Sequence, residues 1–366
     1  MEFNIDKTEL QKALNIVGKG MSSRATLPIL AGVLLTAQDD TVTFQATDLE
    51  TSISHTTAAD VIEPGRAVVP GKLASDIVKS LQDAAVHMKT SDVQVEMGCM
   101  NSSFTLSTLP ADDFPAFPQL TPQQLINVPA ADLARSVQRV AFAASKDEAR
   151  AVLMGIFVEV EEKNIRLVTT DGYRLAMSDM PVVIPQSEPF SAIIPSHAFD
   201  DAMKLAADEQ AVSVGFTENQ IVFSFGDTVF VSRRTEGKYP DYKGLLPKKH
   251  DVAATMDIGE LKTAVKRVSL LAQSHAPVRF HFDLLAQKGV VAAKTQDVGG
   301  AEETIAADVE GEGNIDIAFN HQYVLDGLNV MEGKTLLEMQ DRTKPGIFKQ
   351  EGDDSYLYLV MPMRVG

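Results

Sequence analysis

The chain has 366 residues, of which 45% are hydrophobic, and its 50 acidic and 33 basic side chains give a formal net charge of −17. Such a length allows two or three domains with cores of their own, and the negative balance argues against a protein that holds DNA by neutralising phosphates. The single cysteine, Cys99, excludes an internal disulfide framework, and because neither a signal-peptide pattern at Met1–Asp6 nor a run of about 20 apolar residues is present, we expect a soluble, cytoplasmic protein.

A short strand followed by an amphipathic helix opens each of three successive repeats. The strands are predicted at residues 2–5, 124–128 and 253–256. The helices begin near Leu10, Leu133 and Leu261, and apolar side chains recur in each at the i, i+4, i+7 spacing of one buried stripe. The repeat interval of about 125 residues is the size of a small domain rather than of a solenoid unit. We therefore predict three similar domains, which cover residues 1–120, 121–248 and 249–366.

Alternating strands and a second helix follow in each repeat. Period-two alternation is clearest at 41–47 and 164–169, and it recurs at 212–216 and 220–225. Second helices are predicted over residues 72–81, 196–207 and 321–331. Two helices and about eight strands in each domain indicate an α+β fold with antiparallel sheets. A chain of equivalent domains tends to form an open arc, and such arcs commonly close through cyclic symmetry.

Basic side chains occupy the predicted exposed positions of these helices. On the first helices they are Lys12, Arg135, Arg139, Lys262, Lys266 and Arg267, and on the second helices they are Lys72, Lys79, His197 and Lys204. The two members of each heptad pair on the second helices lie on one helix face. Two interpretations stay open. In the first, these basic residues only keep the protein soluble, as they do on exposed helices in any protein. In the second, they form a basic lining that holds a phosphate backbone without reading bases.

Catalytic and metal-binding patterns are absent from the sequence. The seven histidines show neither HxH nor HExxH spacing, and there is no Gly-Xaa-Ser-Xaa-Gly elbow or glycine-rich phosphate loop. Asp171 and Arg174 invite comparison with a hydrolase loop, but Asp171 is more typical of a turn residue that caps its own backbone. We therefore expect no catalytic residue, no metal and no cofactor. The alternatives are a hydrolase that uses these two residues and a three-domain protein-binding scaffold that never meets DNA.

Six segments carry a resemblance to a known family. They are residues 24–30, 46–50 and 104–110 in the first repeat, 170–176 and 239–242 in the second, and 360–364 at the end of the chain. They resemble the bacterial DNA polymerase III beta subunit family of sliding clamps, in order and over residues 1–366. The resemblance implies the DNA clamp fold and a head-to-tail homodimer, a six-domain ring that encircles duplex DNA without sequence specificity. It implies tethering of DNA polymerase III for processivity, without catalysis or membrane contact, and partners that include the clamp loader and other proteins with clamp-binding motifs.

The resemblance also implies a pocket for short client peptides. Its residues would be Leu153, Thr170, Gly172, Tyr173, Arg174, Leu175, Pro240, Leu245, Val360, Met361, Pro362, Met363 and Arg364. Methionines are an adaptable lining for variable ligands, and a glycine allows close backbone approach. The alternative is that residues 361–363 are only a terminal strand in the core. Gly244 stands where many members of the family carry an arginine, so the preference for client peptides stays open.

DNA-facing and interface residues follow from the same resemblance. The DNA-facing set is Arg24, Lys72, Lys79, Arg135, Arg139, Arg150, His197, Lys204, Lys262 and Lys266. Ala151 and Val152 replace tyrosines common in the family, and Ser196-His197 replaces a basic pair, so we expect a weaker direct grip on DNA. At the protomer interface, Phe104 and Leu106 of one protomer would face Leu270 and Leu271 of its partner. Two different surfaces meet there, and an apolar centre would stabilise the dimer.

Overall fold

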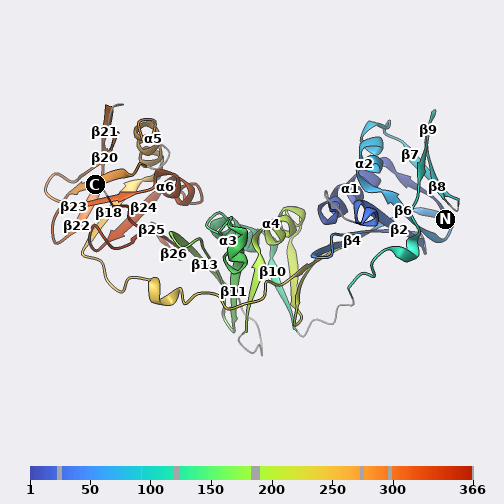
Figure 1. The fold of residues 1–366 in the computed structure, drawn as a ribbon, viewed down its shortest axis with the longest axis horizontal. Helices are drawn as coiled ribbons and strands as arrows, with labels where there is room; N and C mark the ends of the chain where they lie inside the picture. Colours follow the sequence, from blue (N-terminus) through green and yellow to red (C-terminus); the bar gives the residue numbers. More distant parts are fainter. Residues whose placement is uncertain are drawn as a thin grey trace. The chain divides into compact units, whose positions relative to one another are not determined.

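The computed structural model describes residues 1–22, 27–91, 93–118, 124–182, 190–272, 276–295 and 299–364. These residues form six α-helices and antiparallel sheets, drawn in Figure 1. The chain folds as two compact units. The first unit contains Met1–Ala131 and Asp201–Arg234, and the second contains Asp132–Asp200 and Thr235–Gly366. The α+β composition and the antiparallel pairing agree with the prediction from the sequence.

The first unit contains two whole helices, α1 (Lys7–Val17) and α2 (Gly71–Ser80), which pack against each other. Asp6 caps α1, because its Oδ1 accepts hydrogen bonds from the backbone N–H groups of Thr8 (2.7 Å) and Glu9 (3.4 Å). Leu10, Ala13, Leu14 and Val17 form the buried stripe of α1, as its periodicity predicts. Short 3₁₀ helices lie at Gly18–Gly20, Pro28–Ala31 and Ala111–Asp113.

Two sheets complete the first unit. In spatial order, the five-stranded sheet contains β5 (Asp60–Glu63), β1 (Glu2–Asp6), β7 (Ala85–Thr90), β8 (Gln94–Cys99) and β9 (Ser102–Ser107). The eight-stranded sheet contains β10 (Gln124–Pro129), β15 (Ala211–Phe216), β16 (Gln220–Phe225), β17 (Thr228–Arg233), β4 (Thr51–Ala58), β3 (Thr41–Thr47), β2 (Gly32–Gln38) and β6 (Gly65–Pro70). The eight-stranded sheet therefore combines strands of the first and second predicted domains.

The second unit repeats this arrangement with α5 (Ile258–Ser269) and α6 (His321–Leu328), which pack against each other. Its nine-stranded sheet contains β14 (Phe190–Pro195), β11 (Gly155–Glu161), β12 (Asn164–Thr170), β13 (Arg174–Pro181), β26 (Asp353–Val360), β25 (Gly346–Gln350), β24 (Lys334–Met339), β18 (Val252–Asp257) and β22 (Asp308–Gly311). Its four-stranded sheet contains β21 (Gly299–Ala306), β20 (Lys288–Thr295), β19 (Val278–Asp283) and β23 (Ile315–Phe319). Two further 3₁₀ helices are η4 (Glu148–Met154) and η5 (Lys243–Leu245).

The middle repeat is divided between the units. The division falls within α3 (Ala130–Ala141) and α4 (Ser196–Leu205). All six predicted helices are present, and their predicted starts and ends differ from those in the structure by up to three residues. The domain boundaries at 120/121 and 248/249 stay predictions, because β4 pairs with β17 and β13 pairs with β26 across them.

Aromatic side chains form much of the core of the second unit. Ring centroids lie 5.8 Å apart for Phe280 and Phe319, 5.9 Å for Phe319 and Phe348, and 6.3 Å for Phe348 and Tyr358. These four side chains are fully buried and connect the four-stranded sheet with β26. At Gly327 of α6 the helix approaches Tyr358 so closely that a Cβ atom would lie 2.2 Å from the ring. Only glycine therefore allows α6 to pack at this distance.

A buried histidine lies where β4 and β17 join. His55 Nδ1 is 2.8 Å from Thr228 Oγ1, and burial, together with the charge of Lys12, lowers the pKa of His55 from 6.5. A lowered pKa in the folded state means that the unfolded chain binds the proton more readily. The stability that His55 contributes is therefore fully present above about pH 6.5 and is lost as the pH falls below it toward the lowered pKa.

We expect the thermal unfolding midpoint of the chain to fall between about pH 7.5 and about pH 5 and the variant His55→Gln to fall less. The difference between the two slopes isolates His55 from the carboxylates that titrate in both proteins. Calorimetric scans across this range provide the measurement, with His87→Gln as the control, since His87 is at the surface beside Glu2. Parallel slopes for the chain and for His55→Gln would contradict the assignment.

Within the part of the chain that the structure describes, no helix is both long and apolar enough to cross a bilayer.

Candidate functional site

A pocket of about 350 Å³ opens where β13 begins. It lies in the second unit, and its walls come from the turn before β13, from η5 and the residues after it, from the loop between β24 and β25, and from the chain just after β26. The lining residues are Thr170, Gly172, Tyr173, Arg174, Leu175, Gly244, Leu245, Leu246, Pro247, Gln340, Lys344, Pro345, Leu359 and Met361. We call it the β13 pocket. Its size is within the range of pockets that bind small ligands and short peptide anchors.

The β13 pocket has a buried apolar floor and an exposed apolar rim. Leu175 and Leu359 lie opposite each other on β13 and β26, and both belong to a core cluster that includes Tyr239. On the rim, Tyr173 is 61% exposed, Leu245 is 52% exposed and Met361 is 42% exposed. Large apolar side chains at the edge of a concave site are typical of a surface that binds another apolar group. The pocket can therefore hold an apolar peptide anchor.

Hydrogen bonds hold the turn before β13 in one conformation. Asp171 Oδ1 accepts hydrogen bonds from the backbone N–H of Tyr173 (2.9 Å) and of Arg174 (3.1 Å). Thr170 Oγ1 donates to the backbone carbonyl of Arg174 (2.6 Å) and accepts from Gly172 N–H (3.1 Å). Gly172 has a φ of +94°, which a residue with a Cβ rarely adopts. Asp171 is thus the turn residue that the sequence predicts.

Arg174 connects this turn to α6 and to the end of α3. Its Nε donates to Asp171 Oδ2 (2.9 Å), its Nη1 to Asp326 Oδ2 (2.6 Å) and its Nη2 to the carbonyl of Phe142 (2.9 Å). The guanidinium also lies 4.4 Å from the centre of the Tyr323 ring. Burial opposes the charge of Arg174, but Tyr358 and Asp326 outweigh burial and raise its pKa. Because Asp171 and Arg174 hydrogen-bond within this network, neither side chain is free to act on a substrate as a hydrolase residue would.

The chain after β26 passes from the β13 pocket to a neighbouring cavity. Met361 N–H donates to the carbonyl of Tyr173 (2.9 Å), and Met363 N–H donates to the carbonyl of Ala318 (2.8 Å). We call residues 361–364 the tail. Met361 is exposed and Met363 half-buried. The alternative that residues 361–363 form a terminal strand in the core is therefore wrong, because β26 ends at Val360.

The structure brings together seven of the predicted pocket residues. They are Thr170, Gly172, Tyr173, Arg174, Leu175, Leu245 and Met361. Leu153 packs against the core cluster beneath the pocket instead of lining it, and Pro240 and Pro362 are not in the lining. Val360 is a correction, since it is fully buried in the ladder between β13 and β25.

Met363 and Arg364 lie outside the lining of the β13 pocket, and their part in binding client peptides stays a prediction. They line a second cavity, described below, together with the first part of the loop between β24 and β25. The sequence did not identify Leu246, Pro247, Gln340, Lys344, Pro345 and Leu359 as pocket residues. Of these, only Leu359 could have been predicted from the sequence. It lies two residues before Met361, and in extended chain residues two apart point to the same side. The loop 340–345 has no sequence pattern that distinguishes it from any other turn.

Most of the predicted DNA-facing residues are at the surface. Those that the structure exposes are Lys72, Lys79, Arg135, Arg150, His197, Lys204 and Lys266, whereas Lys262 is half-buried and Arg24 lies outside the described residues. Exposed Arg150 donates to Asp147 Oδ2 (3.0 Å) and to the carbonyl of Asp171 (3.2 Å). Arg267, predicted to be exposed, is exposed but forms two 2.6 Å bonds with Glu303.

Arg139 is a correction to the DNA-facing set. The sequence places it at an exposed helix position, but the structure buries its side chain to 9% exposure. Its Nη2 is 2.7 Å from Asp353 Oδ2, and its guanidinium lies 5.2 Å from the centre of the Tyr356 ring. Both contacts are with residues of β26, so Arg139 is held against this strand. It is not available to a phosphate.

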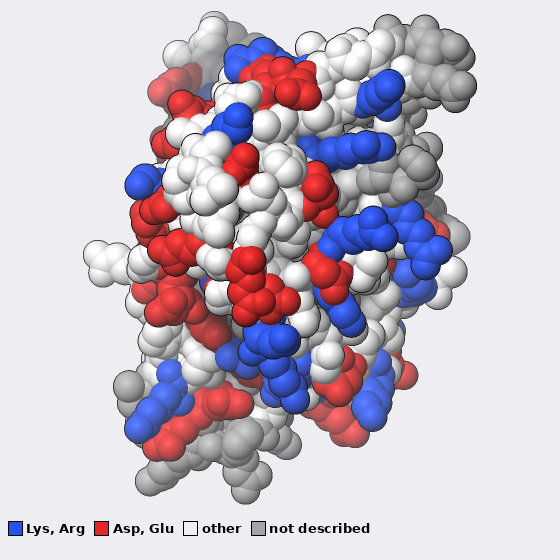
Figure 2. Space-filling model, turned by 90° about the vertical axis from the view of Figure 1, so that its left-hand side faces the viewer, with Lys and Arg blue, Asp and Glu red and all other residues white. Residues whose placement is uncertain are grey.

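Surface charge is mixed in sign where it can be seen. On the face drawn in Figure 2, basic and acidic side chains are interspersed. Among the described residues, no group of three or more His, Cys, Asp or Glu side chains is arranged to hold a metal ion.

The predicted interface residues differ in exposure. Leu270 follows α5 and is 83% exposed, and Leu271 and Phe104 are half-buried. Leu106 is only 6% exposed in the single chain and lies opposite Val95 within its own sheet, and its role at the interface stays a prediction. Its strand, β9, is nevertheless the edge of the five-stranded sheet. An edge strand presents unpaired backbone groups that another chain can use.

Three family models match the chain in succession. The N-terminal, central and C-terminal domains of the DNA polymerase III beta subunit match residues 1–118, 127–241 and 243–364. A beta sliding clamp of Pseudomonas putida is 33% identical, and one of Streptomyces coelicolor is 32% identical, each over 100% of both chains.

Solved structures give the same result for the fold. The sliding clamp of Bacillus subtilis superposes with a TM-score of 0.96 at 29% identity, over 100% of both chains. A sliding clamp of Pseudomonas aeruginosa bound to griselimycin superposes with a TM-score of 0.95 at 29% identity, again over 100% of both chains.

Proposed function

Because the chain belongs to the DNA polymerase III beta subunit family, we propose that its β13 pocket binds short peptides of DNA polymerase III and of other clamp-binding proteins. Membership of this family makes the chain a replicative sliding clamp, a processivity subunit without catalysis of its own. The observation that carries the proposal is that seven residues predicted for peptide binding, from distant parts of the chain, surround one apolar pocket. The exposed rim and the buried floor suit a short peptide with apolar anchors.

We further propose a head-to-tail homodimer that encircles duplex DNA in the cytoplasm. Three similar domains from each of two protomers give a six-domain ring, which is the assembly of the family. Phe104 and Leu106 on edge strand β9 of one protomer would meet Leu270 and Leu271 of its partner. A clamp loader would open this ring. Because the ring is held on DNA by topology, the net charge of −17 is compatible with the function, and weak phosphate contacts permit sliding.

The peptide Gln-Leu-Ser-Leu-Phe is expected to bind the intact chain with a Kd of roughly 1 µM, which corresponds to about −8 kcal/mol. A chain that ends at Val360 keeps every residue of β26 but lacks Met361, whose side chain forms part of the rim and whose N–H bonds to Tyr173. We expect its affinity for the peptide to be at least about tenfold lower. Calorimetric titration of both proteins measures the difference.

A scrambled peptide of the same composition serves as the control for nonspecific apolar binding, and equal unfolding midpoints of the two proteins show that the shortened chain still folds. Equal affinity of both proteins for the peptide would place the binding site elsewhere. Retention on circular but not on linear plasmid DNA separates the clamp from a scaffold that binds peptides only. A protein that binds the peptide but never stays on closed circles would be such a scaffold.

A further inference from the structure

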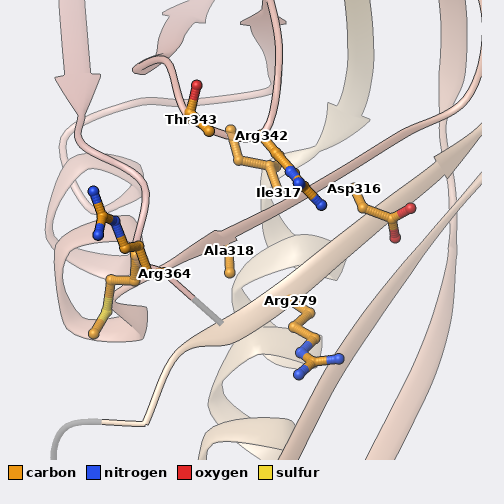
Figure 3. Close-up of a pocket in the computed structure, with 8 residues that line it drawn as sticks. Arg279, Asp316, Ile317, Ala318, Arg342, Thr343 and Arg364 are labelled. Atoms are coloured by element: carbon orange, nitrogen blue, oxygen red, sulfur yellow. The ribbon is translucent and has the colours of Figure 1, made fainter. Parts of the chain in front are cut away.

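A larger cavity, of about 710 Å³, lies next to the tail in the second unit. Its lining residues are Arg279, Asp316, Ile317, Ala318, Arg342, Thr343, Met363 and Arg364. We call it the arginine pocket. Figure 3 shows Arg279, Arg342 and Arg364 on three sides of Ala318. They come from β19, from the loop between β24 and β25, and from the tail.

The lining of the arginine pocket carries excess positive charge. It contains three arginines and one carboxylate, Asp316, whose Oδ1 is 3.0 Å from His281 Nδ1. No described residue forms an ion pair with Arg279, Arg342 or Arg364, although the chain as a whole is strongly acidic. Guanidinium groups bind carboxylates and phosphates through two parallel hydrogen bonds. The lining of the arginine pocket therefore has the charge and the hydrogen-bond donors that suit an anionic group.

The arginine pocket and the β13 pocket share two walls. In the loop between β24 and β25, Arg342 and Thr343 line the arginine pocket, whereas Lys344 and Pro345 line the β13 pocket. Asp341 holds this loop, because its Oδ1 accepts hydrogen bonds from the N–H groups of Thr343 (2.6 Å) and Lys344 (3.1 Å). A ligand that follows this loop passes from one pocket to the other.

The tail forms the second shared wall. Met361 lines the β13 pocket, and Met363 lines the arginine pocket. An extended chain rises about 3.3 Å per residue, so the step between these two methionines is about 7 Å. A peptide held in the β13 pocket needs only a few more residues to reach the arginines. This continuity favours a peptide as the ligand over the phosphates of DNA, which the same guanidinium groups could bind.

We propose that the arginine pocket binds acidic side chains that precede the client motif by about two to four residues. The proposal rests on the proposed function of the β13 pocket and adds a second contact to it. The direction follows from polarity. Leu175 and Leu245 suit the Leu-Phe end of the motif, and the polar side chains of Gln340 and Lys344, in the shared loop, suit its glutamine end.

The test compares two peptides that differ only in charge. In one, Glu-Glu-Ala precedes Gln-Leu-Ser-Leu-Phe, and in the other Gln-Gln-Ala does. At about 50 mM salt we expect the acidic peptide to bind the full chain about fivefold more tightly, and we expect this advantage to shrink at about 500 mM salt. A third peptide carries the Glu-Glu pair after the phenylalanine, and it should gain nothing. Fluorescence anisotropy provides the affinities.

The double variant Arg279→Gln/Arg342→Gln should lose the advantage of the acidic peptide and keep its affinity for the neutral one. A matched control, Lys294→Gln/Lys334→Gln, removes two exposed charges elsewhere in the same unit and should keep the advantage. Equal binding of the acidic and neutral peptides to the full chain would overturn the proposal. So would an arginine variant that binds duplex DNA less tightly but still prefers the acidic peptide, because the arginines would then be a DNA contact.

Failure of the underlying function gives a different result. If no peptide binds at all, the β13 pocket is not a peptide site and the second contact falls with it. If the neutral peptide binds and the acidic extension adds nothing, only the assignment of the arginine pocket is wrong. Competition with inorganic phosphate shows whether a free anion occupies the same site, since it would reduce the advantage without displacing the neutral peptide.

Discussion

Replacing Arg174 with methionine is expected to destabilise the second unit by about 3 kcal/mol, because two partly buried carboxylates would lose the buried cation that they share. The side chains of Arg174, Asp171 and Asp326 are 9%, 14% and 24% exposed. The carbonyl of Phe142 would also lose a hydrogen bond. In a unit of this size the loss corresponds to a fall of about 6–12 °C in the unfolding midpoint, which differential scanning calorimetry measures. Peptide affinity should fall as well, because Arg174 holds the start of β13.

Arg166→Met is the matched control for this prediction. Like Arg174, Arg166 donates two hydrogen bonds to carboxylate oxygens, but both go to Asp179 (2.7 and 2.9 Å), its side chain is 30% exposed and it does not line the β13 pocket. We expect a cost of at most about 1 kcal/mol and unchanged peptide affinity. Equal losses of stability in the two variants would show that burial of the Arg174 network has no special energetic role.

Leu270→Asp is expected to convert the dimer into monomers without unfolding the protein. Leu270 is 83% exposed in the single chain, so a charge there costs little until the partner covers it. In the proposed interface the same charge would be buried without a partner, which costs about 3–5 kcal/mol and weakens dimerisation at least about a hundredfold. Sedimentation velocity over a range of concentrations measures the change.

Leu285→Asp separates an interface effect from a general effect of surface charge. Leu285 is 94% exposed in the turn between β19 and β20, and it is not part of the proposed interface. This variant should stay dimeric. A Leu270→Asp protein that remains dimeric at nanomolar concentration would place the protomer interface elsewhere on the chain.

The sequence predicts the local elements well and their assembly less well. Helix periodicity is a local property, and the stripe that begins at Leu10 is the buried face of α1. Pairing between distant strands has no comparable signal. Nothing in the residues of β4 or β17 indicates that Thr51 pairs with Ser232, so the continuation of a sheet across a predicted domain boundary became visible only in the structure.

The same limit explains which site residues were predicted. Thr170 and Gly172 are predicted because residues 170–176 resemble the corresponding segment of the DNA polymerase III beta subunit family. Lys344 was missed because its place in the β13 pocket depends on how the loop between β24 and β25 folds against β13. Arg139 was assigned to solvent because helical periodicity alone does not show that Asp353 and Tyr356 cover that side of α3.

The division of the middle repeat has a consequence for its independence. One half of its strands continues into the sheet of the first repeat through the pair between β17 and β4, and this half is β10, β15, β16 and β17. The other half continues into the sheet of the third repeat through the pair between β13 and β26, and this half is β14, β11, β12 and β13. A fragment cut out at the repeat boundaries would lose both partners at once and would present two long open edges, at β17 and β13. Open edges of this kind recruit other chains and promote aggregation. The three repeats are alike in plan, yet the central one cannot be expected to persist as a separate soluble piece.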